Sequence, residues 1–152
     1  MFLKKPEKRS SIQANEKLDK AFTTLESLID ALGEKDLPQD VADFINQHIE
    51  GINAFSGTEK ELLKRIQTAQ REVLKRLEKQ LKLVPKNYYR KLWMALGMTV
   101  YGLPFGVAMG AALGSMAFLG IGLPIGMAIG LALGSGMDNK AKAEGRQLDV
   151  DL

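Results

Sequence analysis

The side chains best suited to acid–base or metal chemistry are few and lie in one short segment. His48 is the only histidine, and Asp40 and Asp43 precede it. A histidine near carboxylates can act as a general base or bind a metal ion. The neighbouring residues favour a structural role, because Phe44 and Ile52 lie one helical turn on either side of His48 and carboxylates interact favourably with a helix N-terminus.

Other catalytic patterns are missing from the sequence. The chain has no cysteine, which excludes disulfides, thiolate nucleophiles and cysteine-ligated metals. It contains no phosphate-binding loop, no Ser-His-Asp set and no zinc-ligand spacing. We therefore expect no enzyme activity, no cofactor and no bound metal.

The most specific pattern is an internal repeat of glycines. Residues 102–115 and 122–135 are identical at ten of fourteen positions, and each copy carries four glycines spaced by four residues. Helices in lipid associate through close packing of small residues, and this spacing lines up the glycines along one side of a helix. The predicted packing residues are Gly102, Gly106, Gly110, Gly114, Gly122, Gly126, Gly130 and Gly134.

Alanines lie roughly opposite the glycines in both copies. A helix with small residues on two opposed faces can accept a close neighbour on each, as a ring or bundle of hairpins requires. We therefore expect a homo-oligomer, although two helices that fasten only to each other would also explain the glycines. The residues that define this second face are Ala108, Ala111, Ala112, Ala128 and Ala132.

The repeat resembles that of the bacterial glycine-zipper membrane proteins. These form a loose group with GxxxGxxxG runs that includes channel subunits, toxins and small two-helix proteins. The resemblance covers residues 97–146 and rests on the eight glycines, the two Gly-Leu-Pro starts and Asp138-Asn139-Lys140. Because packing defines the group, it implies helix association but no particular activity. Residues 1–90 resemble no family.

The glycines lie in an uncharged segment that predicts a transmembrane hairpin. Residues 92–137 include no charged side chain and no histidine, and about 20 apolar residues suffice for one crossing. Both flanks are basic, which places both termini in the cytoplasm under the positive-inside rule. We predict a multi-pass protein of the cytoplasmic (inner) membrane, with the hairpin over 94–138, helices at about 89–117 and 121–138, and a reversal near 118–122.

Two prolines interrupt this segment. A proline can begin a helix, where its missing N–H is no loss, or kink a helix that is already running. We expect Pro104 to kink the first crossing. For Pro124 both roles stay open, and if it begins the second crossing, that crossing is short.

Basic and aromatic residues are interleaved over 85–93, directly before the apolar segment. Such a mixture can indicate a nucleic-acid surface, but amphipathic rings beside a membrane segment favour headgroup depth. We expect contact with anionic lipid headgroups and no nucleic acid. The predicted interface residues are Tyr88, Tyr89, Arg90, Lys91 and Trp93.

Residues 1–84 predict a cytoplasmic domain of three amphipathic helices. Apolar residues recur at steps of three and four over 11–32, from Pro38 to before Ser56, and from Thr58 to Val84. Gly33 fits a C-terminal cap, Thr58 with Glu61 fits a capping box, and Pro85 follows the third helix. Residues 10–59 carry a net charge of −7 and residues 60–91 a net charge of +8. The basic third helix can face the acidic helices, lipid headgroups or both on different faces, and the alternative is that its charges form only a solvated surface.

Together these patterns predict an all-α protein with a three-helix cytoplasmic unit, a glycine-zipper transmembrane hairpin and a polar cytoplasmic tail over 139–152. Residues 1–10 are basic without an apolar run, so we expect no cleaved signal peptide. Two functions remain open. The first is an oligomeric pore, channel or membrane-perturbing protein with an assembly or regulatory domain; the second is a membrane anchor that recruits a cytoplasmic protein partner.

Overall fold

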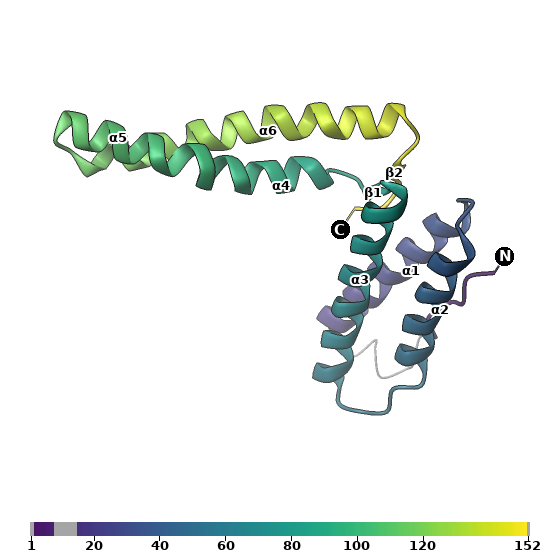
Figure 1. Ribbon diagram of the computed structural model, residues 1–152. Helices are drawn as coiled ribbons and strands as arrows, with labels where there is room; N and C mark the ends of the chain where they lie inside the picture. Colours follow the sequence, from purple (N-terminus) through teal and green to yellow (C-terminus); the bar gives the residue numbers. More distant parts are fainter. Residues whose placement is uncertain (1, 8–14, 152) are drawn as a thin grey trace. The chain divides into compact units, whose positions relative to one another are not determined.

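The computed structural model describes residues 2–7 and 15–151 (Figure 1). Within these ranges the protein is helical apart from one short pair of strands, which confirms the predicted all-α class. The chain divides into two compact units. The charged unit comprises Met1–Pro85 and Leu148–Leu152, and the apolar unit comprises Lys86–Gln147.

The charged unit is built on α1 (Glu16–Gly33), α2 (Gln39–Asn53) and α3 (Glu59–Leu81). Both α1 and α2 pack on α3. Each helix turns one apolar stripe inward, because burying that stripe removes it from water. The core includes Leu18, Phe22, Leu25, Ile29, Leu32, Val41, Ile45, Ile49, Ile66, Val73 and Leu77.

The ends of these helices follow local side-chain chemistry. The predicted capping box is present: the Thr58 hydroxyl accepts from the Glu61 N–H at 3.4 Å, and the Glu61 carboxylate accepts from the Thr58 N–H at 3.0 Å. The Thr58 hydroxyl and N–H lower the pKa of Glu61 below its ordinary 4.5. This contact therefore stabilises the fold near neutral pH and is lost as the pH falls through the lowered pKa.

Two predicted helix ends are wrong. Gly33 is the last residue of α1 rather than a left-handed cap, and Glu34 caps the helix in the right-handed region. The third helix ends at Leu81, before Pro85, because Lys82 adopts a left-handed conformation with φ 55°. That turn lets Leu83 and Val84 become buried. The predicted start of the first helix, at residue 11, lies outside the described residues.

The C-terminal residues return to the charged unit. The short strands β1 (Val84–Pro85) and β2 (Gln147–Leu148) pair, Leu148 is fully buried in the core, and Val150 is 4% exposed. The segment predicted as a polar tail therefore contributes buried apolar side chains to this unit. Leu148 and Val150 are apolar, and burial in an existing core stabilises them.

The apolar unit is a hairpin of two long helical arms (Figure 1). The first arm joins α4 (Tyr88–Leu96), a π-helical turn (Gly97–Gly102) and α5 (Leu103–Leu113). A single 3₁₀ turn (Met116–Phe118) leads into the second arm, α6 (Leu119–Ala143). The helix α6 packs against all three parts of the first arm.

The chain reverses earlier than the sequence predicts. Gly114 ends α5 in a left-handed conformation with φ 70°, which a side chain would disfavour, and the next helical arm begins at Leu119. Gly120 and Gly122, the glycines expected in the turn, lie inside α6. Pro124 also lies inside α6, so of its two possible roles the structure excludes the start of the second arm.

Pro104 lies in the first turn of α5, directly after the π-helical turn. A proline within a continuous helix lacks one N–H and clashes with the carbonyl four residues earlier. Widening the preceding turn is a known way to accommodate such an interruption. The π-helical turn thus marks the place where the sequence predicts a kink.

Candidate functional site

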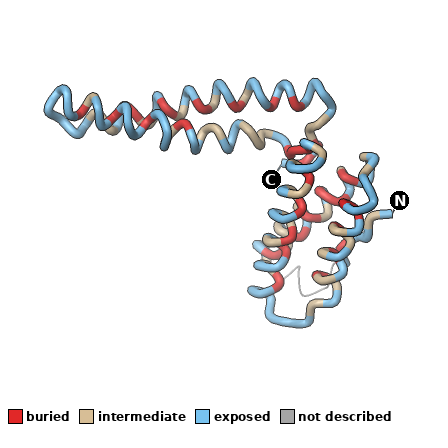
Figure 2. The backbone as a smooth tube through the Cα atoms, viewed as in Figure 1, coloured by how far each residue is buried: buried red, intermediate tan, exposed pale blue. Residues whose placement is uncertain are grey.

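The glycines of α6 form one side of the contact between the two arms of the hairpin. Gly122, Gly126, Gly130 and Gly134 are buried, and they recur once per turn along the inner side of the arm (Figure 2). A Cβ atom added to Gly134 would lie 2.5 Å from the carbonyl oxygen of Tyr89. One added to Gly130 would overlap the carbonyl oxygen of Trp93. Backbone atoms cannot yield to a side chain, so these positions require glycine.

Glycines of the first arm meet the same face from the other side. A Cβ atom on Gly102 would lie 2.9 Å from the carbonyl oxygen of Gly122, and one on Gly106 would lie 2.9 Å from the Cα atom of Leu119. Gly97 is equally enclosed, since its added Cβ would lie 2.9 Å from the Cα atom of Gly130. Sequence reasoning missed Gly97 because it lies outside the repeat.

The spacing of the first-arm glycines explains the π-helical turn. Gly97 and Gly102 are five residues apart, whereas Gly102, Gly106 and Gly110 are four apart. An α-helix would carry a five-residue step away from the contact face, but a π-helical turn, with i to i+5 hydrogen bonds, keeps both residues on it. Gly97 and Gly102 are both buried at the two ends of this turn. The unequal spacing was the available signal for Gly97.

The last two predicted glycines of the first arm are placed differently. A Cβ atom on Gly110 would meet the carbonyl oxygen of Ser115 at 3.1 Å, so Gly110 packs against the turn rather than against α6. Gly114 has no neighbour within 4 Å of an added Cβ, and its left-handed φ is its structural requirement. Helix packing therefore accounts for only part of the glycine repeat.

The predicted alanine faces point away from the hairpin contact. Ala108, Ala112, Ala128 and Ala132 are all exposed, as is Ala111. Two further glycines of α6 continue the four-residue spacing of these alanines: Gly136 follows Ala132 by four residues, and Gly120 precedes Ala128 by eight. An added Cβ at either glycine would meet nothing within 4 Å. The outer side of α6 therefore carries small residues at steps of four that the hairpin itself does not use.

Asp138 fastens the open end of the hairpin. Its two carboxylate oxygens accept hydrogen bonds from the backbone N–H groups of Tyr89 at 3.0 Å and Arg90 at 2.9 Å, at the start of α4. These N–H groups have no partner within the helix, and a carboxylate there also interacts favourably with the helix dipole. Asp138 is only 7% exposed. It follows Gly134 by four residues, so the glycine spacing could have placed it on this face.

The predicted interface residues gather at the start of α4. The rings of Tyr88 and Tyr89 meet edge to face with centroids 5.2 Å apart. Arg90 and Lys91 are exposed, and Trp93 is half-buried with its carbonyl against Gly130. The aromatic and basic side chains thus lie at the end of the hairpin that carries Asp138.

His48 takes part in a surface cluster of α2 and α3. Its Nε2 lies 3.2 Å from a Glu72 carboxylate oxygen, and its ring meets Phe44 edge to face with centroids 4.6 Å apart. Asp40 lies apart from it, where hydrogen bonds from Gln80 and Arg76 lower the pKa of its carboxyl group. Within residues 2–7 and 15–151, no three His, Asp or Glu side chains converge on a possible metal position.

Comparisons with known proteins give no further guide to the function of these features. No family model, no curated protein and no solved structure matches the chain.

Proposed function

We propose that the chain is an integral membrane protein in which the apolar hairpin anchors the charged helical unit to the bilayer, with both ends of the hairpin on the cytoplasmic side. One observation carries this proposal. The chain leaves the charged unit after Pro85 and returns to its core at Leu148. A segment that begins and ends in one folded unit crosses a bilayer an even number of times, in agreement with the basic residues on both flanks.

The length and surface of the two arms support a membrane location. Tyr88–Leu113 spans 26 residues and Met116–Ala143 spans 28 residues, and the most apolar 18-residue stretches of the two have mean hydropathies of 1.5 and 2.1. In their most apolar stretches only 22% and 17% of residues are buried within the protein. The core helix of a water-soluble protein is mostly buried, so lipid is the favoured environment for these apolar side chains.

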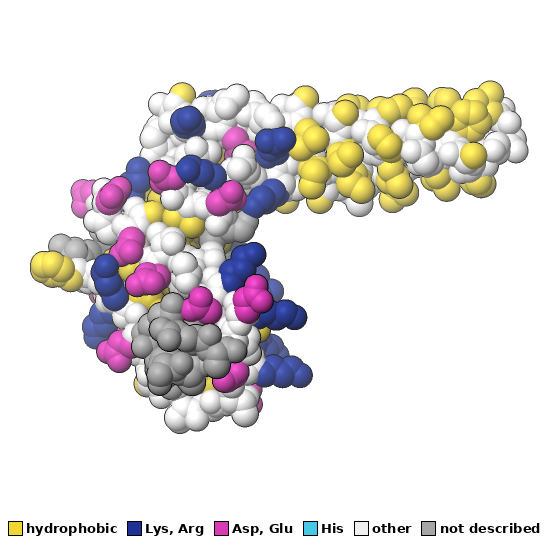
Figure 3. All heavy atoms as spheres, turned by 180° about the vertical axis from the view of Figure 1, so that it is seen from behind, with side chains coloured by type: hydrophobic (Ala, Val, Ile, Leu, Met, Phe, Trp, Pro, Cys, Tyr) yellow, Lys and Arg dark blue, Asp and Glu magenta, His cyan; other side chains and the backbone are white. Residues whose placement is uncertain are grey.

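Among the described residues, every exposed large apolar side chain except Phe2 lies on the hairpin (Figure 3). Val100, Leu113, Met116 and Ile121 each expose more than half of their surface. Thr99 satisfies its hydroxyl within its own helix, by donating to the Ala95 carbonyl at 3.1 Å. These side chains are suited to lipid tails rather than to a watery path.

The topology can be tested by labelling single cysteines, because the natural chain has none. We expect Met116→Cys, at the reversal, to react with a membrane-impermeant maleimide from one side of sealed vesicles only. Lys86→Cys and Lys142→Cys, on the two flanks, should react only from the opposite side. Labelling of all three positions from the same side would contradict a spanning hairpin and indicate one that lies within a single leaflet.

Among the possible roles, a membrane anchor that recruits a protein partner agrees best with the geometry. The glycines that could have joined different chains are largely enclosed within one hairpin. The remaining outward surface of the arms is mostly apolar. The hairpin therefore has what an anchor needs, whereas a conducting path normally needs polar groups that face it.

The second candidate is an oligomeric pore or membrane-perturbing assembly, and the exposed alanines favour it. Small residues on an outer helix face permit close approach of another helix in lipid. We expect any such assembly to depend on Ala108, Ala112, Ala128 and Ala132 rather than on the enclosed glycines. The charged unit would then act as its assembly or regulatory domain.

Variants of the outer face separate the two candidates. An assembly through the alanines predicts that Ala128→Leu with Ala132→Leu lowers the mass of the protein in nanodiscs to that of a single chain. A pore predicts in addition that the wild-type protein releases dye from liposomes and that these variants do not. Ile125→Leu, an apolar change at an exposed position of the same arm, is the matched control. A single-chain mass without dye release in the wild type would leave the anchor as the function.

A further inference from the structure

Residues 2–7 of the charged unit pack against α1 and α2. These residues, here called the N-terminal arm, have no regular secondary structure, and their contacts join them to both helices, whose facing sides are here called the seam. Lys5 forms an ion pair with Asp30 of α1 at 2.8 Å, and Lys4 forms one with Glu50 of α2. The arm is thus held by both helices that border the seam.

Two asparagines of α2 bind the backbone of the arm. Asn46 accepts from the N–H of Lys4 at 2.7 Å and donates to the carbonyl of Phe2 at 3.5 Å. Asn53 accepts from the N–H of Glu7 at 2.9 Å and donates to the carbonyl of Lys5 at 3.1 Å. Each side-chain amide therefore bonds both a donor and an acceptor of the arm.

The two asparagines match the repeat of an extended chain. They are seven residues apart on α2, a rise of about 10.5 Å at 1.5 Å per residue. The bonded arm groups are three residues apart, about 10 Å in an extended chain. The α2 surface therefore binds an extended backbone at two equivalent points.

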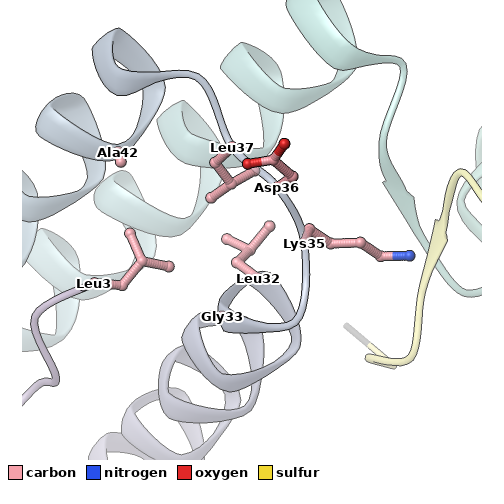
Figure 4. Close-up of a pocket in the computed structure, with 7 residues that line it drawn as sticks. All are labelled: Leu3, Leu32, Gly33, Lys35, Asp36, Leu37 and Ala42. Atoms are coloured by element: carbon pink, nitrogen blue, oxygen red, sulfur yellow. The ribbon is translucent and has the colours of Figure 1, made fainter. Parts of the chain in front are cut away.

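Two apolar side chains of the arm are fully or partly buried. Pro6 is buried, and Leu3 is half-buried against the core. Leu3 lies beside a pocket of about 160 Å³ formed where α1 ends and α2 begins, with Leu32 and Leu37 among its lining residues (Figure 4). Backbone bonds that provide affinity, combined with side-chain pockets that provide specificity, are characteristic of grooves that bind extended peptides.

We propose that the seam is a groove that recognises an extended segment of a partner protein with the pattern apolar, basic, basic, proline, and that the arm holds the groove closed in the free protein. All the contacts just described are non-covalent and use groups that a separate peptide of the same pattern also has. Asp30 and Glu50 select the two basic residues by charge. The acidic character of residues 10–59, with a net charge of −7, favours the same kind of partner.

This inference rests on the proposed anchor function and names the chemistry of its partner. When the arm occupies the groove, the apparent affinity for another peptide equals the intrinsic affinity multiplied by the fraction of time that the groove is open. Release of the arm would therefore control recruitment to the membrane.

The test uses the full chain in detergent micelles and a fluorescent peptide of sequence Phe-Leu-Lys-Lys-Pro-Glu. The arm is disabled by changing Leu3, Lys4, Lys5 and Pro6 to serine. We expect the arm-disabled chain to bind the peptide at least about tenfold more tightly than the wild type does, because its groove is open. Adding Asn46→Ala and Asn53→Ala should weaken binding at least about tenfold, because four hydrogen bonds to the peptide are lost.

Three results would overturn the proposal. The first is no peptide binding by an arm-disabled chain that keeps its helical circular dichroism. The second is equal peptide affinity in two arm-disabled variants, one with Asn46→Ala and Asn53→Ala and one with Gln67→Ala. Gln67 is a control on the exposed surface of α3. The third is that intact wild-type chain displaces the fluorescent peptide as effectively as unlabelled peptide does. That result would assign the groove to a second copy of the chain.

Hydrogen exchange of the wild type gives a result that does not depend on how the variants fold. We expect the Lys4 and Glu7 amides to exchange faster than core amides of α1 and α2, because the arm opens while the unit stays folded. Equal protection would overturn the proposal, since the arm would then leave only on global unfolding. Peptide binding in detergent does not require a membrane crossing, so failure here and failure of the topology experiment are distinguishable.

Discussion

Replacing Gly130 with leucine is expected to force the two arms of the hairpin apart. A Cβ atom at this position would overlap the Trp93 carbonyl oxygen, lie 2.7 Å from its carbon and lie 3.1 Å from the Cα atom of Met94. All three are backbone atoms, so the larger residue can be accommodated only by moving a helix. Overpacking costs about 1–3 kcal/mol in ordinary cores, and here it also removes the close approach on which helix association in lipid depends.

The same helix offers a matched control. Gly136→Leu adds an identical side chain to α6, but nothing lies within 4 Å of the added Cβ. Spin labels on cysteines at Leu92 and Asn139, one on each arm, measure the separation. We expect one narrow distance distribution for the wild type and for Gly136→Leu, and a longer, broader one for Gly130→Leu. Identical distributions for the two glycine variants would contradict an arm contact that requires glycine.

Removing the Asp138 carboxylate is expected to loosen the open end of the hairpin. Asp138→Ala leaves the N–H groups of Tyr89 and Arg90 without their acceptor in a half-buried position. An unsatisfied polar group of this kind costs about 1–3 kcal/mol. The effect falls on the start of α4, because the rest of the contact uses glycines that the substitution does not touch.

Amide exchange of Tyr89 and Arg90 measures this effect directly. Each 1.4 kcal/mol corresponds to a factor of ten, so we expect these amides to exchange about tenfold to a hundredfold faster in Asp138→Ala. Asn139→Ala, which changes the exposed neighbour, should leave their exchange unchanged. Asp138→Asn keeps one acceptor oxygen and should fall between the two. Unaltered exchange in Asp138→Ala would exclude a role for the carboxylate in holding the arms together.

Local patterns account for the features that sequence reasoning predicted well. The capping box at Thr58 and Glu61 involves residues three apart, and the buried stripe of α3 repeats at helical spacing. The long uncharged segment reflects the composition of the chain alone, and it corresponds to the two arms that are long and apolar enough to cross a membrane. Such patterns involve neighbours within one or two turns, so the sequence contains all the information they need.

The features that sequence reasoning missed join residues that are far apart in the chain. Asp138 accepts hydrogen bonds from backbone groups 48 and 49 residues away. Almost every residue has a backbone N–H group, so the sequence does not indicate which of them Asp138 binds. Asn46 and Asn53 likewise bind the backbone of residues 2–7, which lie 42 to 48 residues before them in the chain. The burial of Leu148 likewise depends on a core formed by α1, α2 and α3. Each contact requires the fold to exist before its partner can be identified.

By itself the sequence determined the all-helical class, the apolar segment and the four-residue glycine period, because hydropathy and side-chain size act along each helix. Only the tertiary structure decided what the glycines meet. It encloses most of them between two arms of one chain, adds Gly97 through a π-helical turn, assigns Gly114 to the reversal and leaves the alanines outside. The reason is physical: a period defines a face of a helix, but only the path of the chain brings another backbone against that face.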